Sequence, residues 1–232
     1  MDSRKDNLLK IIVEEYIRSA NPVGSQLVCE KYLPEVSPAT IRNEMAELEE
    51  NGLVSQPHVS AGRIPTLAGY KYYLEKFVGE GKIVSKHKQI LDDLSQGMNS
   101  DRESLKNLAK ALAEISEEAV LVGFSPLDVY YTGISNLFRQ PEFLHHQSVF
   151  SMSEIIDHLD EVMAEVFSQV TEKAKIFLGE ENPFGNMSSV VLAKCRLGNG
   201  EGLIGIMGPN RMNYEENLGL LKYSQEIFNN LS

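Results

Sequence analysis

Residues 38–50 carry the side chains whose types and spacing point to a definite chemistry, which is hydrogen bonding to nucleic acid bases. Ile41, Met45 and Leu48 recur at helical spacing, so they share one face of a predicted helix. The outer face of its first turns holds small or hydrogen-bonding side chains, namely Ala39, Thr40, Arg42 and Asn43. Asparagine can pair with the major-groove edge of adenine, and arginine can bind guanine or a phosphate. The pattern therefore predicts a helix that contacts DNA.

Both ends of this helix carry residues that favour a helix boundary. Ser37 can accept a hydrogen bond from a free first-turn N–H, and Pro38 suits the first helical position because it has no N–H to satisfy. Gly52 ends the helix. The outer face becomes acidic only in the last turns, at positions 47, 49 and 50. A helix that enters the major groove with its N-terminus favours this order, because its dipole attracts phosphate.

A predicted hairpin follows the helix. Residues 54–57 and 63–65 form two extended arms around a loop of residues 58–62. Gly62 is expected to supply the positive φ of a tight hairpin. The loop contains no acid, so His58, Ser60 and Arg63 are candidate contacts to a phosphate backbone or a minor groove.

Two further helices are predicted upstream. Apolar residues recur at helical spacing over residues 9–17, Asn21-Pro22 interrupts them, and Ser25 begins a second short helix with Val28, Cys29 and Tyr32 inside. Three helices and a hairpin in this order indicate a winged helix-turn-helix. The spacing of the helices is equally compatible with a small packing module that binds protein rather than DNA.

Length and charge limit the interpretation. A chain of 232 residues can form two modest domains. The formal net charge is −11, and residues 1–80 hold 9 basic and 12 acidic side chains. DNA binding must therefore rest on a local basic patch and not on a global field. The two cysteines are far apart in the sequence and match no metal or redox spacing. The sequence has neither a signal peptide nor an 18-residue apolar run. We therefore expect a soluble cytoplasmic protein that binds no membrane.

The remainder of the chain predicts an α+β domain. The domain boundaries are expected at 1–78, 79–118 (a helical linker) and 119–232. Strands are predicted at residues 119–124, 174–178, 190–197 and 203–207, with a long helix from Ser153 and a final helix over residues 220–231. The fold class is α+β, with helices flanking a sheet.

Two apparent motifs do not support a site. Residues 200–205 satisfy G-x-G-x-x-G, but the third glycine falls inside an apolar strand and not at a helix start, while Asn199-Gly200 is typical of a hairpin turn. Glu142, His145, His146 and His158 could be imagined as metal ligands, yet solvated surface histidines are the expected state. We expect no enzyme, no metal and no cofactor.

Several segments match one family closely. In the first 78 residues they are VEEYIRSANPVGS (13–25), SPATIRNEMAELEENGLVSQPHVSAGRIPT (37–66) and AGYKYYLEKFV (68–78). In the second half they are GISNLFRQPEF (133–143), FLGEENP (177–183) and GLIGIMGPNRMNY (202–214). With these strings in this order, the chain resembles the HrcA family of heat-inducible transcription repressors.

The resemblance implies a winged-helix domain followed by a GAF-like effector domain. It also implies a homodimer that represses chaperone operons by binding an inverted-repeat CIRCE operator in double-stranded DNA, with chaperonin as a protein partner. Typical members carry an inserted dimerisation subdomain before GISNLFRQPEF, and this chain is expected to lack it. The alternative function is a ligand-responsive regulator whose GAF-like half binds a small molecule.

Overall fold

The computed structural model describes residues 3–171, 173–197 and 200–231. The chain forms two compact units, Met1–Gly79 (unit 1) and Glu80–Ser232 (unit 2). Among the described residues, no helix is both long and apolar enough to cross a membrane.

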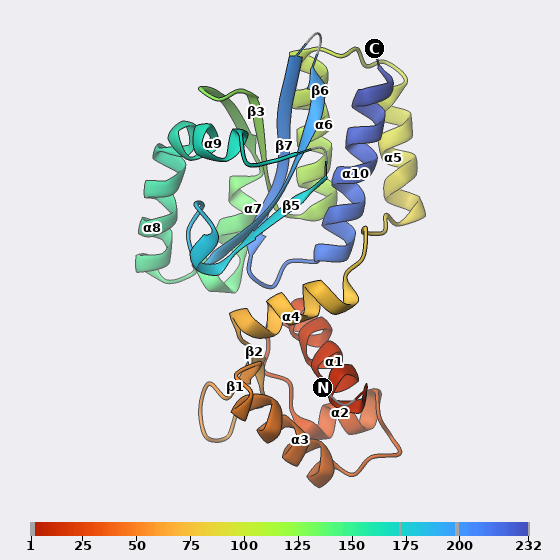
Figure 1. Ribbon diagram of the computed structural model, residues 1–232, viewed down its shortest axis with the longest axis vertical. Helices are drawn as coiled ribbons and strands as arrows, with labels where there is room; N and C mark the ends of the chain where they lie inside the picture. The colour runs from red at the N-terminus through yellow and green to blue at the C-terminus, as the bar shows by residue number, and fades with distance from the viewer. Residues whose placement is uncertain (1–2, 172, 198–199, 232) are drawn as a thin grey trace. The chain divides into compact units, whose positions relative to one another are not determined.

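Unit 1 consists of helices and one short hairpin (Figure 1). In chain order its elements are α1 (Ser3–Ser19), α2 (Ser25–Lys31), α3 (Pro38–Glu50), β1 (Val54–Ser55), β2 (Ile64–Pro65) and α4 (Leu67–Phe77). The amphipathic pattern of α1 buries Leu8, Leu9 and Ile12 completely. Val28 of α2 is buried, but Cys29 and Tyr32, which follows the last residue of α2, are only half-buried, so the predicted inner face is partly wrong.

Buried acids of α1 join the helices of unit 1. The Glu15 carboxylate contacts Tyr32 and Lys31, and Asp6 contacts Lys76 and Tyr72 of α4. These pairs satisfy carboxylates that would otherwise be buried at a large cost in solvation free energy. They tie α2 and α4 to the long α1 and fix the frame on which α3 lies.

Unit 2 is built around a five-stranded antiparallel sheet with the order β4-β3-β7-β6-β5. The strands are β3 (Ala119–Ser125), β4 (Asp128–Thr132), β5 (Lys175–Leu178), β6 (Ser188–Leu197) and β7 (Gly200–Pro209). The helices are α5 (Ser85–Ser95), α6 (Arg102–Ser116), α7 (Ile134–Arg139), α8 (His146–Asp157), α9 (Leu159–Phe167) and α10 (Tyr214–Asn230), with short 3-10 turns at Pro141–Phe143 and Gly179–Glu181.

Helices cover both faces of this sheet, with α6 and α10 on one face and α7, α8 and α9 on the other (Figure 1). Leu121, Leu192 and Met207 pack with Phe143 and Met163 on the second face. Side chains one position along each strand point to the opposite face, as the two-residue repeat of a strand requires. The α+β fold class is confirmed, and the arrangement is GAF-like.

Three features of unit 2 differ from the predicted elements. The predicted long helix from Ser153 is two helices, α8 beginning at His146 and α9 following a break at His158, whose backbone leaves the helical region. Strand β4 was not predicted, because its side chains are half-buried or exposed and show no clear alternation. The segment 79–118, expected to be a linker, lies mainly in unit 2, where α6 buries Leu105, Leu108 and Leu112.

The sequence pattern G-x-G-x-x-G lies in strand β7, as expected, and β7 pairs along its length with β6. The predicted turn at Asn199-Gly200 falls partly outside the described residues. Cys195 is buried in β6, and burial raises the pKa of its thiol to about 12, so the sulfur is a packed neutral group.

Candidate nucleic-acid interface

Helix α3 presents the predicted polar face to solvent. Ile41, Met45 and Leu48 are buried, as predicted from their spacing. The side chains of Arg42 and Asn43 are exposed on the other side. Among the described residues neither has a hydrogen-bond or ion-pair partner, so both are available to a ligand. Ser37 and Ala39 are also exposed, and Thr40 is half-buried.

The ends of α3 form as predicted from the capping residues. The Ser37 hydroxyl accepts a hydrogen bond from the Thr40 N–H at 3.1 Å. Asn51 ends the helix, and Gly52 follows with φ of +72°, a conformation that strongly favours glycine. The start of α3, where Thr40, Arg42 and Asn43 lie, is therefore stabilised by the Ser37 cap.

The loop between β1 and β2 extends away from the helices of unit 1 (Figure 1). The Gln56 side-chain amide donates to the Val59 carbonyl at 3.0 Å and to the Ala61 carbonyl at 2.9 Å. His58 and Ser60 are exposed, with 3.3 Å between His58 Nδ1 and Ser60 Oγ. Gln56 therefore gives the loop a defined shape from within, and no sequence pattern singled it out.

Gly62 is required at its position, but not for the predicted reason. Its φ is not positive, so the predicted tight-hairpin conformation is wrong at this residue. A Cβ atom here would lie 2.3 Å from the Val23 carbonyl carbon. The close approach arises because Val23 and Arg63 exchange backbone hydrogen bonds of 2.8 and 2.9 Å. Gly62 thus lets the hairpin lie directly against the segment before α2.

Arg63 does not extend toward solvent. Its side chain is 12% exposed, and its Nη2 atom lies 2.9 Å from Glu49 Oε2. The other oxygen of Glu49 accepts the Gln56 N–H at 2.9 Å. One carboxylate in the last turn of α3 therefore holds both arms of the hairpin. The 14-residue separation of Glu49 and Arg63 gives no sequence signal for this pair.

A cleft of about 540 Å³ separates α3 from the hairpin loop within unit 1. Its lining includes Arg42 and Met45 of α3, residues 24–26 and Gln56, and residues 59–63 of the loop. The cleft brings together four of the nine predicted contacts, namely Arg42, Ser60, Gly62 and Arg63. Within the described lining it holds no acidic residue, which suits a polyanion.

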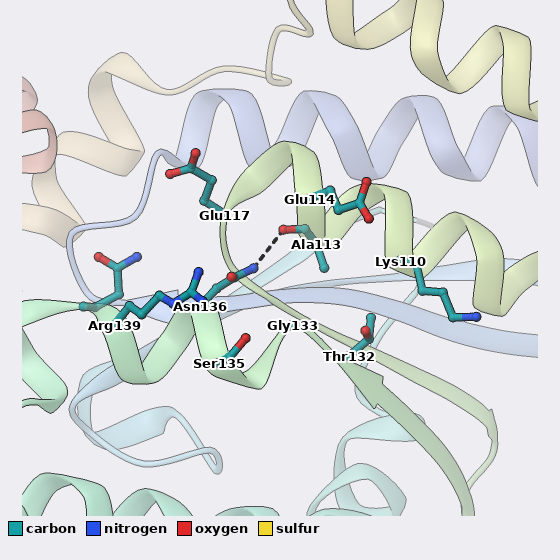
Figure 2. A pocket seen from close by; sticks show the side chains of 10 residues that line it. Lys110, Ala113, Glu114, Glu117, Thr132, Gly133, Ser135, Asn136 and Arg139 are labelled. Atoms are coloured by element: carbon teal, nitrogen blue, oxygen red, sulfur yellow. Dashed lines mark hydrogen bonds between the residues drawn. The ribbon is translucent and has the colours of Figure 1, made fainter.

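Unit 2 contains a second cavity, of about 560 Å³, between α6, the end of β4 and α7 (Figure 2). Its charged side chains are of both signs: Lys110, Glu114, Glu117 and Arg139. Asn136 closes one side, because its Nδ2 atom donates to the Ala113 carbonyl at 3.0 Å and to the Glu118 carbonyl at 3.2 Å.

A buried acid lies close to this second cavity. Glu118 is 6% exposed, and its carboxylate packs against Gly208, where a Cβ would approach within 2.4 Å. Burial raises the pKa of Glu118 to about 8, while nearby Arg211 opposes the shift. Arg211 bonds to Glu142 at 2.6 Å and to Gln140 at 2.7 Å. Glu142, considered above as a metal ligand, is therefore an ion-pair partner.

The described residues contain no cluster of three or more acids, histidines or cysteines able to hold a metal ion. His158 instead places Nδ1 2.9 Å from the Glu154 carbonyl at the end of α8.

Asn182, from the FLGEENP segment, uses its side chain within the turn, where it forms hydrogen bonds with Phe184, Gly185 and Ser188. The family-matching segments of the second half thus supply hydrogen bonds and an ion pair that stabilise unit 2.

Comparison with known proteins places the chain in a family. Residues 70–217 match the family described as HrcA protein C terminal domain. The heat-inducible transcription repressor HrcA of Carboxydothermus hydrogenoformans is 28% identical, with 99% of each chain covered. That of Desulfitobacterium hafniense is 40% identical over 122 residues, which are 53% of this chain but only 33% of the relative. A crystal structure of a hypothetical protein superimposes over 100% of both chains with a TM-score of 0.75 and 20% identity, which shows the shared fold.

The fold and these matches define the class of transcription repressors with a GAF-like effector domain. Within that class, the chain belongs to the HrcA family. The alignment with the Carboxydothermus relative runs over 338 positions against the 232 residues of this chain, so a large part of that relative has no counterpart in it.

Proposed function

We propose that unit 1 is a winged helix-turn-helix in which α3 is the recognition helix and the β1–β2 hairpin is the wing. The protein would bind an inverted-repeat CIRCE operator ahead of chaperone operons as a homodimer, with chaperonin as the partner that keeps it active. The observation that carries the proposal is the pair Arg42 and Asn43, exposed on a rigidly capped helix beside an ordered hairpin.

The chemistry of this face fits sequence reading. Asn43 can make two hydrogen bonds to adenine, and Arg42 can bind guanine or a phosphate at the edge of the 540 Å³ cleft. Thr40 lies in the first turn, near the N-terminal end that the helix dipole makes favourable for phosphate. The acids of α3 are mostly neutralised within the chain, because the buried Glu44 pairs with Arg4, Glu47 with Lys5 and Glu49 with Arg63.

The first test concerns base reading by Asn43. Asn43→Ala should weaken binding to a duplex carrying the CIRCE repeat by roughly 1–3 kcal/mol while hardly affecting random DNA, because a base contact is lost and no charge is removed. Titration of both duplexes with the full chain measures the two affinities. Asn7→Ala, at an exposed asparagine of α1, is the control and should bind both as the wild type does. Equal losses on both duplexes would remove Asn43 from base reading.

A homodimer requires an interface, and exposed apolar side chains of unit 2 offer candidate surfaces. Leu127, in the turn before edge strand β4, and Tyr131 of β4 are 77% and 44% exposed. Leu144, before α8, and Phe150 of α8 are 70% and 59% exposed. In the absence of the inserted subdomain, these are the surfaces from which a modest interface would be built.

The second test concerns heat. On warming, the dimer should dissociate at the same temperature at which operator affinity is lost, because an inverted repeat needs two recognition helices. The stability of a dimer with a small interface also depends on protein concentration. Sedimentation velocity at increasing temperature, in parallel with operator titration, measures both. A protein that remains dimeric while it loses affinity would exclude dissociation as the switch. A tenfold increase in protein concentration should move both transitions upward together.

The cavity between α6 and α7 favours one second candidate, a ligand-responsive repressor (Figure 2). Side chains of both signs would suit a small zwitterion. This candidate differs from heat release in a measurable way, since the ligand would change operator affinity at constant temperature.

A further inference from the structure

Val59 occupies the tip of the wing with its side chain 97% exposed, the largest value among the exposed large hydrophobic residues of the described chain. Its neighbours His58 and Ser60 are polar and also exposed, so Val59 belongs to no apolar patch. A single exposed valine needs no explanation by itself. Its position becomes informative because the loop that carries it is held in a defined shape.

The loop that carries Val59 is held more firmly than an ordinary surface turn. Both hydrogens of the Gln56 side-chain amide are used on the carbonyls of Val59 and Ala61, and the Ala61 N–H donates to the His58 carbonyl at 2.8 Å. The backbone of Gln56 is in turn held by Glu49. These bonds bury no core, so their effect is to fix the direction in which the tip projects.

The chemistry of valine selects one part of a DNA duplex. A methyl-bearing side chain gains nothing from a solvated phosphate, but it gains apolar contact with the sugars and base edges that line the minor groove. Apolar side chains that enter this groove also wedge between base steps. The wing tip contains no acid that would oppose such an approach.

We propose that Val59 is a minor-groove contact of the wing, held in position by the Gln56 side chain and, behind it, Glu49. The proposal rests on the DNA-binding function proposed above. Gln56 and Glu49 are positioning residues, because they act on DNA only through the loop. Arg63, paired with Glu49, belongs to the same support and is not assigned to a phosphate.

The test compares two exposed valines in the full chain on a CIRCE duplex. Val59→Ser should weaken binding about tenfold, the loss expected when an apolar side chain is no longer buried. Val84→Ser, at a valine 52% exposed in unit 2, is the matched control and should bind as the wild type does. The slope of log affinity against log salt should be the same in all three proteins, because no charged contact changes.

A second variant separates positioning from contact. Gln56→Met keeps the side-chain length but cannot donate to the two carbonyls, so it should weaken binding, and Val59→Ser should then cost much less in its background than alone. Netropsin, which fills the minor groove at A·T pairs, should inhibit the wild type more strongly than Val59→Ser. Wild-type affinity in Val59→Ser, or full additivity of the two substitutions, would overturn the proposal. A wild type that fails to bind the duplex at low salt would overturn the DNA-binding function and this contact together.

Discussion

Glu118→Gln should resist denaturant better than the wild type above about pH 8, and the two proteins should be nearly equal near pH 5. The folded pKa of Glu118 is raised from 4.5 to about 8, so the folded state keeps a proton that the unfolded chain has released. The free energy of unfolding should therefore fall as the pH rises from about 4.5 to about 8, and it should level off above pH 8. The amide of glutamine does not ionise in this pH range, so the variant should be more stable than the wild type by up to about 4 kcal/mol at the alkaline end.

Chemical denaturation of unit 2 at a series of pH values measures this effect. Glu117→Gln is the matched control, because Glu117 is the adjacent acid but its side chain is not buried. The control should keep the wild-type slope between pH 5 and 8. A wild type whose stability does not fall over this range would show that Arg211 keeps Glu118 charged, and the burial argument would be wrong.

Gly62→Ala should reduce operator affinity by at least about tenfold and lower the melting temperature of unit 1. The new methyl group would lie 2.3 Å from the Val23 backbone, where neither partner is a flexible side-chain end. The bridge between Val23 and Arg63 would have to open, and the wing would lose its attachment.

Operator titration and thermal unfolding of the full chain measure the two effects. Gly79→Ala is the control, since Gly79 belongs to unit 1 but not to the cleft lining, and a Cβ there would meet nothing within 4 Å. It should leave both quantities near their wild-type values. If Gly62→Ala binds as the control does, the close contact is not needed for the wing to function.

Local chemistry was enough to predict α3 from the sequence. Its cap at Ser37, its stop at Gly52 and the spacing of Ile41, Met45 and Leu48 are properties of neighbouring residues, and all are confirmed. The function of Gly62 was not predictable in this way, because the constraint comes from Val23, nearly 40 residues earlier. A glycine in a turn suggests a positive φ, whereas at this position a tertiary contact sets the requirement.

The same distinction applies to the charged residues. Glu49 belongs to a run of acids that reads as a solvated helix end, and Arg63 reads as a free cation, yet they form one pair. Glu117 and Glu118 look alike in the sequence, but the sheet buries only Glu118, beneath Gly208. The helix break at His158 and the half-exposed strand β4 were missed because neither alters the apolar pattern strongly.

The ion pairs of unit 1 have a consequence for how the protein would respond to osmotic stress. Lys5, Arg63 and Lys76 already face carboxylates of their own chain, at Glu47, Glu49 and Asp6. Cations that are neutralised in this way add little to the release of condensed ions when DNA binds. Operator occupancy should then change only gently when the potassium concentration rises or falls. A regulator with this property keeps nearly the same DNA affinity when the ionic strength changes, so its response stays specific to its own signal.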